Sequence, residues 1–170
     1  MLRSLLALVA LAGLAACDGT SAGAQRVFED EALFTPVAGI TETDERATVL
    51  SRDPSDWRIG PDYVNRVSPL LELPNPNPVR RGQAVAFLVD TQGVPGGLRL
   101  YVLARDRAGN VDLVPIADPN AVRPEAAQAG FYSFSVSASQ IARGGPGLYR
   151  VVLLDGARGV VTYGDLEVTG

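Results

Sequence analysis

Residues 98–103 read Leu-Arg-Leu-Tyr-Val-Leu, an alternation that places Leu98, Leu100 and Val102 on one face of an extended chain. Successive side chains of a β-strand point to opposite faces, so this spacing predicts a strand with one buried face. The run Phe-Tyr-Ser-Phe-Ser-Val at residues 131–136 has the same period. These two stretches indicate a protein built on β-sheets.

The chain on both sides of these stretches has the same character from Val67 onward. Short β-type runs are separated by glycine-rich turns, where residues that tolerate positive φ are needed. The expected strands are residues 67–73, 83–89, 98–104, 111–116, 131–136, 148–154 and 160–168. Seven short strands at this spacing predict an all-β, antiparallel β-sandwich over residues 67–170. Residues 119–129 contain two prolines, which favour a long connection over a helix.

The N-terminal part of the chain lacks this periodicity. Residues 18–26 are small and polar, which predicts that residues 17–26 form a flexible tether. Residues 27–66 are expected to form a loop-rich segment, with one short strand near residues 47–50. The expected organisation is therefore a tether, a loop-rich segment and one sandwich domain.

The composition excludes several classes of chemistry. All 15 basic residues are arginine, because the chain has neither lysine nor histidine. Without histidine there is no Ser-His-Asp triad and no imidazole metal ligand, and without lysine there is no Schiff base. A net charge of −4 and scattered arginines argue against nucleic acid as a partner. We expect a non-enzymatic protein without cofactor or metal.

The first 16 residues have the pattern of a secretory signal peptide. Arg3 supplies a positive start, and residues 5–12 form an apolar run that is too short to span a bilayer as a mature helix. Residues 14–17 then read Leu-Ala-Ala-Cys, which resembles the lipobox of bacterial lipoproteins. The resemblance implies cleavage between Ala16 and Cys17 and acyl chains such as palmitate on Cys17, the only cysteine.

Lipid on Cys17 would make the membrane the first partner of this protein. Two or three acyl chains anchor a protein stably, whereas a single chain binds only marginally. The expected location is the cell envelope, with the choice of inner or outer membrane and of periplasmic or surface face left open. The alternative is ordinary cleavage after Ala12, which would leave Cys17 as a free thiol in an exported protein.

Several stretches of the C-terminal domain resemble one known family. They are Leu-Pro-Asn-Pro-Asn-Pro at 73–78, Leu-Arg-Leu-Tyr-Val at 98–102, Arg-Ala-Gly-Asn-Val at 107–111 and Gly-Leu-Tyr-Arg-Val-Val-Leu at 147–153. Over about residues 67–168 they are similar to the Ig-like domain related to the flagellar hook-capping protein. The resemblance implies an Ig-like β-sandwich. The usual Pro-Asn-Pro-Phe lacks its phenylalanine, and Asn77 stands in that place.

The most distinctive stretch outside the expected strands is residues 53–58, Asp-Pro-Ser-Asp-Trp-Arg. One interpretation makes Trp57, the only tryptophan, an exposed platform for a sugar or a protein partner. The alternative has Asp53 and Asp56 capping turns while Trp57 plugs one end of the sandwich. Burial of a lone tryptophan is the more common arrangement.

Two acidic sets have a functional and a plain interpretation. Asp106, Asn110 and Asp112 offer oxygen ligands for calcium, but hairpin chemistry explains them without an ion. Asp155, Asp165 and Glu167 could form the paired acids of a glycoside hydrolase, but nothing in the sequence sets their separation. Solvated strand ends are the default for the second set.

Three functions remain in competition. The leading one is a membrane-anchored, non-enzymatic module for interaction with an envelope protein or for envelope structure. The second is a carbohydrate- or ligand-binding module that uses Trp57 and the tyrosines Tyr101, Tyr132, Tyr149 and Tyr163. The third is a hydrolase that uses carboxylates alone. An exposed aromatic cluster would favour the second, and two facing acids in a concave pocket would favour the third.

Overall fold

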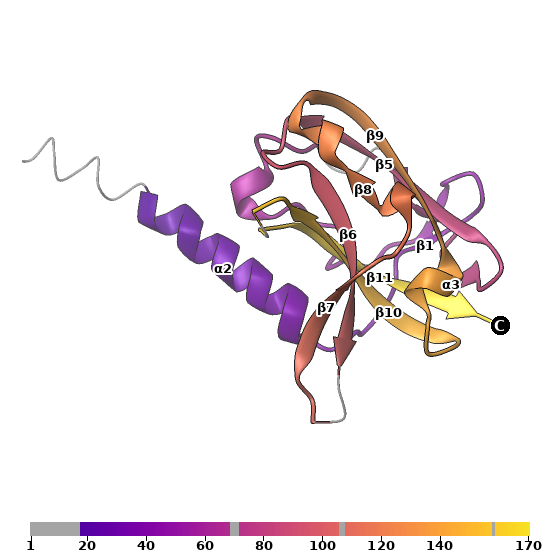
Figure 1. Cartoon of the computed structure of the whole chain (residues 1–170). Helices are drawn as coiled ribbons and strands as arrows, with labels where there is room; N and C mark the ends of the chain where they lie inside the picture. Colours follow the sequence, from indigo (N-terminus) through magenta and orange to yellow (C-terminus); the bar gives the residue numbers. More distant parts are fainter. Residues whose placement is uncertain (1–17, 69–71, 106–107, 158) are drawn as a thin grey trace, which may run out of the picture.

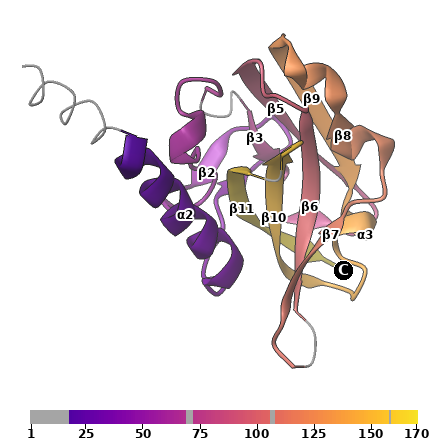
Figure 2. The same ribbon diagram turned by 60° about the vertical axis from the view of Figure 1, so that its left-hand side comes forward.

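A computed structural model of the chain describes residues 18–68, 72–105, 108–157 and 159–170. Two β-sheets face each other, and one long helix lies against the larger sheet (Figures 1 and 2). The predicted all-β sandwich is confirmed. The expected signal peptide, its cleavage site at Ala16 and Cys17 lie outside the described residues.

The larger sheet has the strand order β4-β11-β10-β6-β7, and the short strand β8 also pairs with β6. These strands are β4 (Val79–Arg80), β6 (Leu98–Arg105), β7 (Val111–Pro115), β8 (Val122–Arg123), β10 (Gly147–Asp155) and β11 (Val160–Thr169). All neighbours are antiparallel except β4 and β11, which run parallel. Within this sheet the longest pairing joins β10 to β11, and it carries the side chains of the first site described below.

The smaller sheet has the order β3-β5-β9, from strands β3 (Glu72–Asn75), β5 (Ala84–Gln92) and β9 (Ala129–Ser137). A separate two-stranded sheet joins β1 (Glu42–Thr43) to β2 (Val49–Ser51). Short helices fill the connections: η1 (Pro61–Tyr63), η2 (Pro119–Ala121), η3 (Pro124–Ala127) and α3 (Ala138–Ile141). The three 3₁₀ helices each begin with proline, whose fixed φ suits a first helical position.

The main core lies between the two sheets. Leu98, Leu100 and Val102 are all buried, as the alternation in residues 98–103 predicts. From the opposite sheet, the rings of Phe87 and Phe134 stack with centroids 4.9 Å apart. Burial of such side chains stabilises the folded state by about 25 cal/mol for each Å² of apolar surface removed from water. This interface is therefore the main source of stability.

All seven expected strands exist, with the largest displacement at the first. A strand was expected over residues 67–73, but β3 covers Glu72–Asn75, and Val67 makes only an isolated bridge to Thr91. The short strand expected near residues 47–50 is β2. Residues 119–129 contain η2 and η3 within a connection, as the two prolines suggested.

The N-terminal segment is loop-rich over residues 35–66, as expected, but residues 18–34 differ from the expectation. Residues 18–34 form the helix α2 (Asp18–Phe34), not a flexible tether followed by loops. Phe28 and Ala32 lie one turn apart on one face of the helix and are buried against Val152 and Tyr163 on the outer face of the larger sheet. Glycine, serine and threonine near its start weaken helix propensity, so tertiary packing of this face stabilises the helix.

Candidate functional site

Arg150 is the centre of a buried polar cluster. It lies on β10 directly opposite Asp165 on β11, and both side chains are about 95% buried. Nε donates to Oδ1 and Nη2 to Oδ2, each at 2.8 Å. This two-bond geometry is the strongest form of an arginine–carboxylate pair.

The same guanidinium also holds the end of α2. Arg150 Nη1 donates to the carbonyl oxygens of Thr35 at 2.7 Å, Ala32 at 3.2 Å and Glu31 at 3.3 Å. The last carbonyls of a helix have no partner within the helix, and a cation at this end is favoured by the helix dipole. Arg150 therefore attaches the C-terminal end of α2 to the larger sheet.

Asp56 and Asn77 bind the N-terminal segment to β11 beside this cluster. Asp56 Oδ2 accepts from Thr41 N at 2.7 Å, and Oδ1 accepts from Asp165 N at 3.1 Å. Asn77 is fully buried; its Nδ2 donates to Thr41 O and Asp165 O, and its Oδ1 accepts from Glu167 N. Asn77 thus joins Thr41, Asp165 and Glu167 through three side-chain hydrogen bonds.

The ionisation of Asp56 reflects its surroundings. The pKa of Asp56 is raised to about 7, chiefly because burial penalises the charged form; the nearby Asp165 carboxylate contributes to the rise, and the N–H groups of Thr41 and Asp165 oppose it. Asp56 and Asp165 are two converging carboxylates, but both are buried and Asp165 is neutralised by Arg150. Their arrangement is structural.

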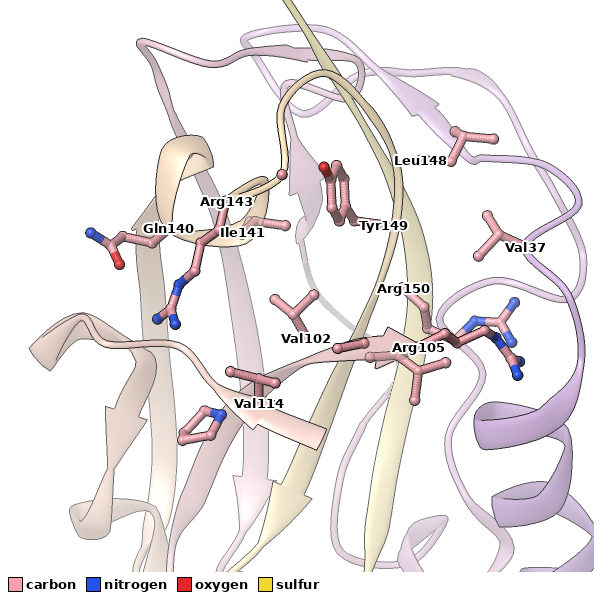
Figure 3. A pocket seen from close by; sticks show the side chains of 14 residues that line it. Val37, Val102, Arg105, Val114, Gln140, Ile141, Arg143, Leu148, Tyr149 and Arg150 are labelled. Carbon is pink, nitrogen blue, oxygen red and sulfur yellow. The ribbon is translucent and has the colours of Figure 1, made fainter. Parts of the chain in front are cut away.

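A pocket of about 460 Å³ has Arg150 in its lining. Figure 3 shows it between β6, β7, the turn after α3 and the start of β10. We call it the Arg143 pocket. Its apolar walls come from Val37, Val102, Val114, Ile141, Leu148 and Tyr149. Two exposed arginines, Arg105 and Arg143, also line it, and its described lining contains no aspartate or glutamate.

Trp57 does not form an exposed platform. It is only 4% exposed and packs in the main core against Phe87, with ring centroids 6.1 Å apart. Its indole lies directly over Gly164, where a Cβ would collide with the ring. Trp57 therefore fills part of the sandwich, as the alternative expects, and presents no exposed ring, whereas Asp56 does not cap a turn but accepts from Thr41 N and Asp165 N. Asp53 caps a turn by accepting from Ser55 N.

Two of the three acids considered for hydrolysis, Asp155 and Asp165, are far apart, while Glu167 lies two residues after Asp165 on β11. Asp155 accepts from the Tyr63 hydroxyl at 2.5 Å and from Gly159 N, while Asp165 pairs with Arg150. Asp155 is five residues beyond Arg150 on β10, which at strand rise puts it about 17 Å from Asp165. Carboxylates of glycoside hydrolases lie about 5–10 Å apart. Asp155 and Asp165 therefore do not form such a pair.

The calcium candidates and the tyrosines are also accounted for. Asp106 lies outside the described residues, and within the described ones no group of three or more acidic, cysteine or histidine side chains could hold a metal. The tyrosines do not form one stripe: Tyr132 and Tyr149 pack against the main core, whereas Tyr101 and Tyr163 belong to the cluster beneath α2. Of these, Tyr149 alone lines the Arg143 pocket.

Sequence reasoning did not single out Arg150, Asn77 or Arg143. Arg150 interrupts an otherwise apolar expected strand, which is a signal for a buried, paired charge. In the sequence, Asn77 stands out only because the Pro-Asn-Pro stretch that it follows resembles a motif with phenylalanine at this place. Arg143 has no signal in the sequence, because the pocket that it lines is formed by walls from β6, β7 and β10.

No model of a known protein family matches this chain, and no curated protein matches it either. In the described part of the chain, the helices lack the length and apolar composition that crossing a bilayer requires.

Proposed function

We propose that this protein is a membrane-anchored lipoprotein of the bacterial cell envelope, whose β-sandwich serves as a non-enzymatic interaction or structural module. The Leu-Ala-Ala-Cys stretch at residues 14–17 supports the anchor. The observation that carries the proposal is the place of this stretch in the chain, directly before residues 18–34, which belong to α2 and are attached to the sandwich at their far end.

This attachment makes the connection to the anchor short and stiff. Gln25 is buried and donates from Nε2 to the carbonyl of Val160, so α2 contacts β11 from its second turn onward. Seven residues separate Asp18 from Gln25, which is about 10 Å along a helix axis. A lipid on Cys17 would therefore hold the sandwich close to the membrane surface and limit its orientations.

The second candidate, a ligand-binding module, is favoured by the Arg143 pocket. Its volume of about 460 Å³ lies within the roughly 300–1,000 Å³ of small-molecule sites, and its walls are apolar with few polar groups. Both functions are compatible, since an anchored sandwich can present a binding pocket. Trp57 is buried and so contributes no aromatic surface that could bind a carbohydrate.

The anchor is tested by intact mass spectrometry of protein extracted with detergent from cells that express the full chain. We expect a mature mass that begins at Cys17 and includes acyl chains. Cys17→Ser should abolish both the cleavage before residue 17 and the added mass, while Ser21→Ala, a control in the first turn of α2, should retain them. An unmodified chain cleaved after Ala12 would refute the anchor.

A further inference from the structure

We propose that the Arg143 pocket binds a single-chain carboxylate amphiphile, with its carboxylate on Arg143 and its apolar chain along Val102, Val114 and Leu148. This inference does not depend on the lipid anchor. It rests on three features of the pocket: its charge, an unsatisfied guanidinium and an apolar surface exposed to water.

The charge of the pocket is opposite to that of the chain. The chain has a net charge of −4, yet among the described residues the pocket is lined by three arginines and by no acidic side chain. Arg150 is neutralised by Asp165, which leaves Arg105 and Arg143 to define the local field. A concave, low-dielectric wall with one sign of charge concentrates ligands of the other sign. The pocket is therefore complementary to an anion.

Arg143 is the cation that remains available. Arg105 Nη2 donates to the carbonyl oxygens of Leu33 and Phe34 at the end of α2. Arg143 makes neither a hydrogen bond through its guanidinium nor an ion pair to any part of the chain that the structure describes. Figure 3 shows its side chain extending from the turn after α3 toward the side of the pocket where Val114 lies.

The remaining walls favour an apolar body on the ligand. Leu148 is 49% exposed at the pocket, an unusual position for a large aliphatic side chain. Ile141 and Val102 also line the pocket and are buried, so the apolar lining includes core side chains. A bound hydrocarbon chain would cover this surface and remove it from water.

The acid group follows from the geometry of arginine. A guanidinium presents paired N–H donors that match the two oxygens of a carboxylate. Arg105 keeps its charge but uses Nη2 to donate to two carbonyls of α2, so Arg143 is the guanidinium whose paired donors are open to both oxygens of one carboxylate. The favoured ligand is therefore a fatty-acid-like monocarboxylate, not a phospholipid headgroup.

Photoaffinity labelling tests this assignment. The full chain, in nanodiscs of zwitterionic lipid, is irradiated with a decanoic acid analogue that carries a diazirine in its chain, and the labelled tryptic peptides are identified by mass spectrometry. We expect labels in residues 100–105 and 144–150, which line the pocket. Unlabelled decanoate should compete at least tenfold better than decanol, because the alcohol lacks the charge that Arg143 binds.

Matched variants locate the carboxylate. Arg143→Gln should reduce labelling at least tenfold, while Arg81→Gln, an exposed arginine outside the pocket, should leave it unchanged. Equal labelling of the two variants, equal competition by decanol, or competition by lysophosphatidic acid but not decanoate would each overturn the proposal. Labelling should persist in Cys17→Ser, so failure of the anchor and failure of the pocket are distinguishable.

Discussion

Arg150 and Asp165 are direct register partners on the antiparallel strands β10 and β11, and two hydrogen bonds of 2.8 Å join their buried side chains. Because Arg150 also donates to three carbonyls at the end of α2, one ion pair links the sheet to the helix that follows the proposed anchor. The stability of the N-terminal segment should depend on this pair.

Replacement of Arg150 by methionine should lower the free energy of unfolding by about 3–5 kcal/mol, since it leaves the Asp165 carboxylate buried without its partner. Urea denaturation measures the change. Trypsin should also cleave faster after Arg26, which lies in α2, because the helix loses its attachment.

Arg99→Met, which replaces an exposed arginine on neighbouring β6, is the control and should change stability by less than about 0.5 kcal/mol. The double variant Arg150→Met/Asp165→Leu should recover much of the loss; a double variant as unstable as Arg150→Met would contradict this account.

Asn77→Ala should cost about 2–4 kcal/mol, because it leaves the buried carbonyls of Thr41 and Asp165 and the N–H of Glu167 without partners. Thermal and urea denaturation give the change. Asn120→Ala, at an exposed position in η2, should have little effect. A loss below about 0.5 kcal/mol for Asn77→Ala would show that water replaces these hydrogen bonds.

The stability of the protein should fall as pH rises from about 4 to 7. The pKa of Asp56 is raised to about 7 by burial, so the folded state binds a proton that the unfolded state has already released above pH 4. Between pH 5 and pH 8 this group should remove about 2 kcal/mol of stability. Urea midpoints at several pH values measure the slope.

The control for this pH dependence is a matched pair of isosteric variants. Asp56→Asn cannot titrate and should lose most of the slope, although its amide replaces one of the two hydrogen-bond acceptors and lowers stability at pH 5. Asp112→Asn, at an exposed position on β7, should keep the slope of the natural chain. If Asp56→Asn keeps the full slope, another group is responsible.

Gly164→Ala should destabilise the protein by about 1–3 kcal/mol, because its methyl group would occupy the space of the Trp57 indole. The displaced ring should report the change through a red shift in tryptophan fluorescence, which arises from Trp57 alone. Gly82→Ala is the control, since a Cβ there meets no atom within 4 Å. An unshifted spectrum and an unchanged melting temperature in Gly164→Ala would place the indole elsewhere.

The strands of the sandwich could be predicted because they depend on local patterns. The alternation of residues 98–103 and the glycine turns identify each strand within a few positions, since a half-buried strand needs period two and its turn needs positive φ. At the first expected strand, Val67 is a β-branched residue of the kind that strands favour, but it forms only an isolated bridge, to Thr91. The strand β3 therefore starts later, at Glu72. Pairing partners, which lie far away in sequence, decided that boundary.

The helix and the two sites could not be predicted in the same way. The first residues of α2 have weak helix propensity, and the helix is stabilised by packing of Phe28 and Ala32 on a sheet face formed more than 100 residues later. Trp57 is buried because Gly164 leaves room for its indole. Arg143 is a candidate ligand-binding residue because three other elements enclose a pocket beside it.

The sequence by itself determined the class of fold, the approximate strands and the features that point to an anchor at Cys17, because periodicity, turn chemistry and leader composition are properties of neighbouring residues. The tertiary structure alone decided which charges are paired, which aromatic side chains are buried and where a ligand could bind. These depend on contacts such as Arg150 with Ala32 and Asn77 with Asp165, whose partners are 118 and 88 residues apart in the chain.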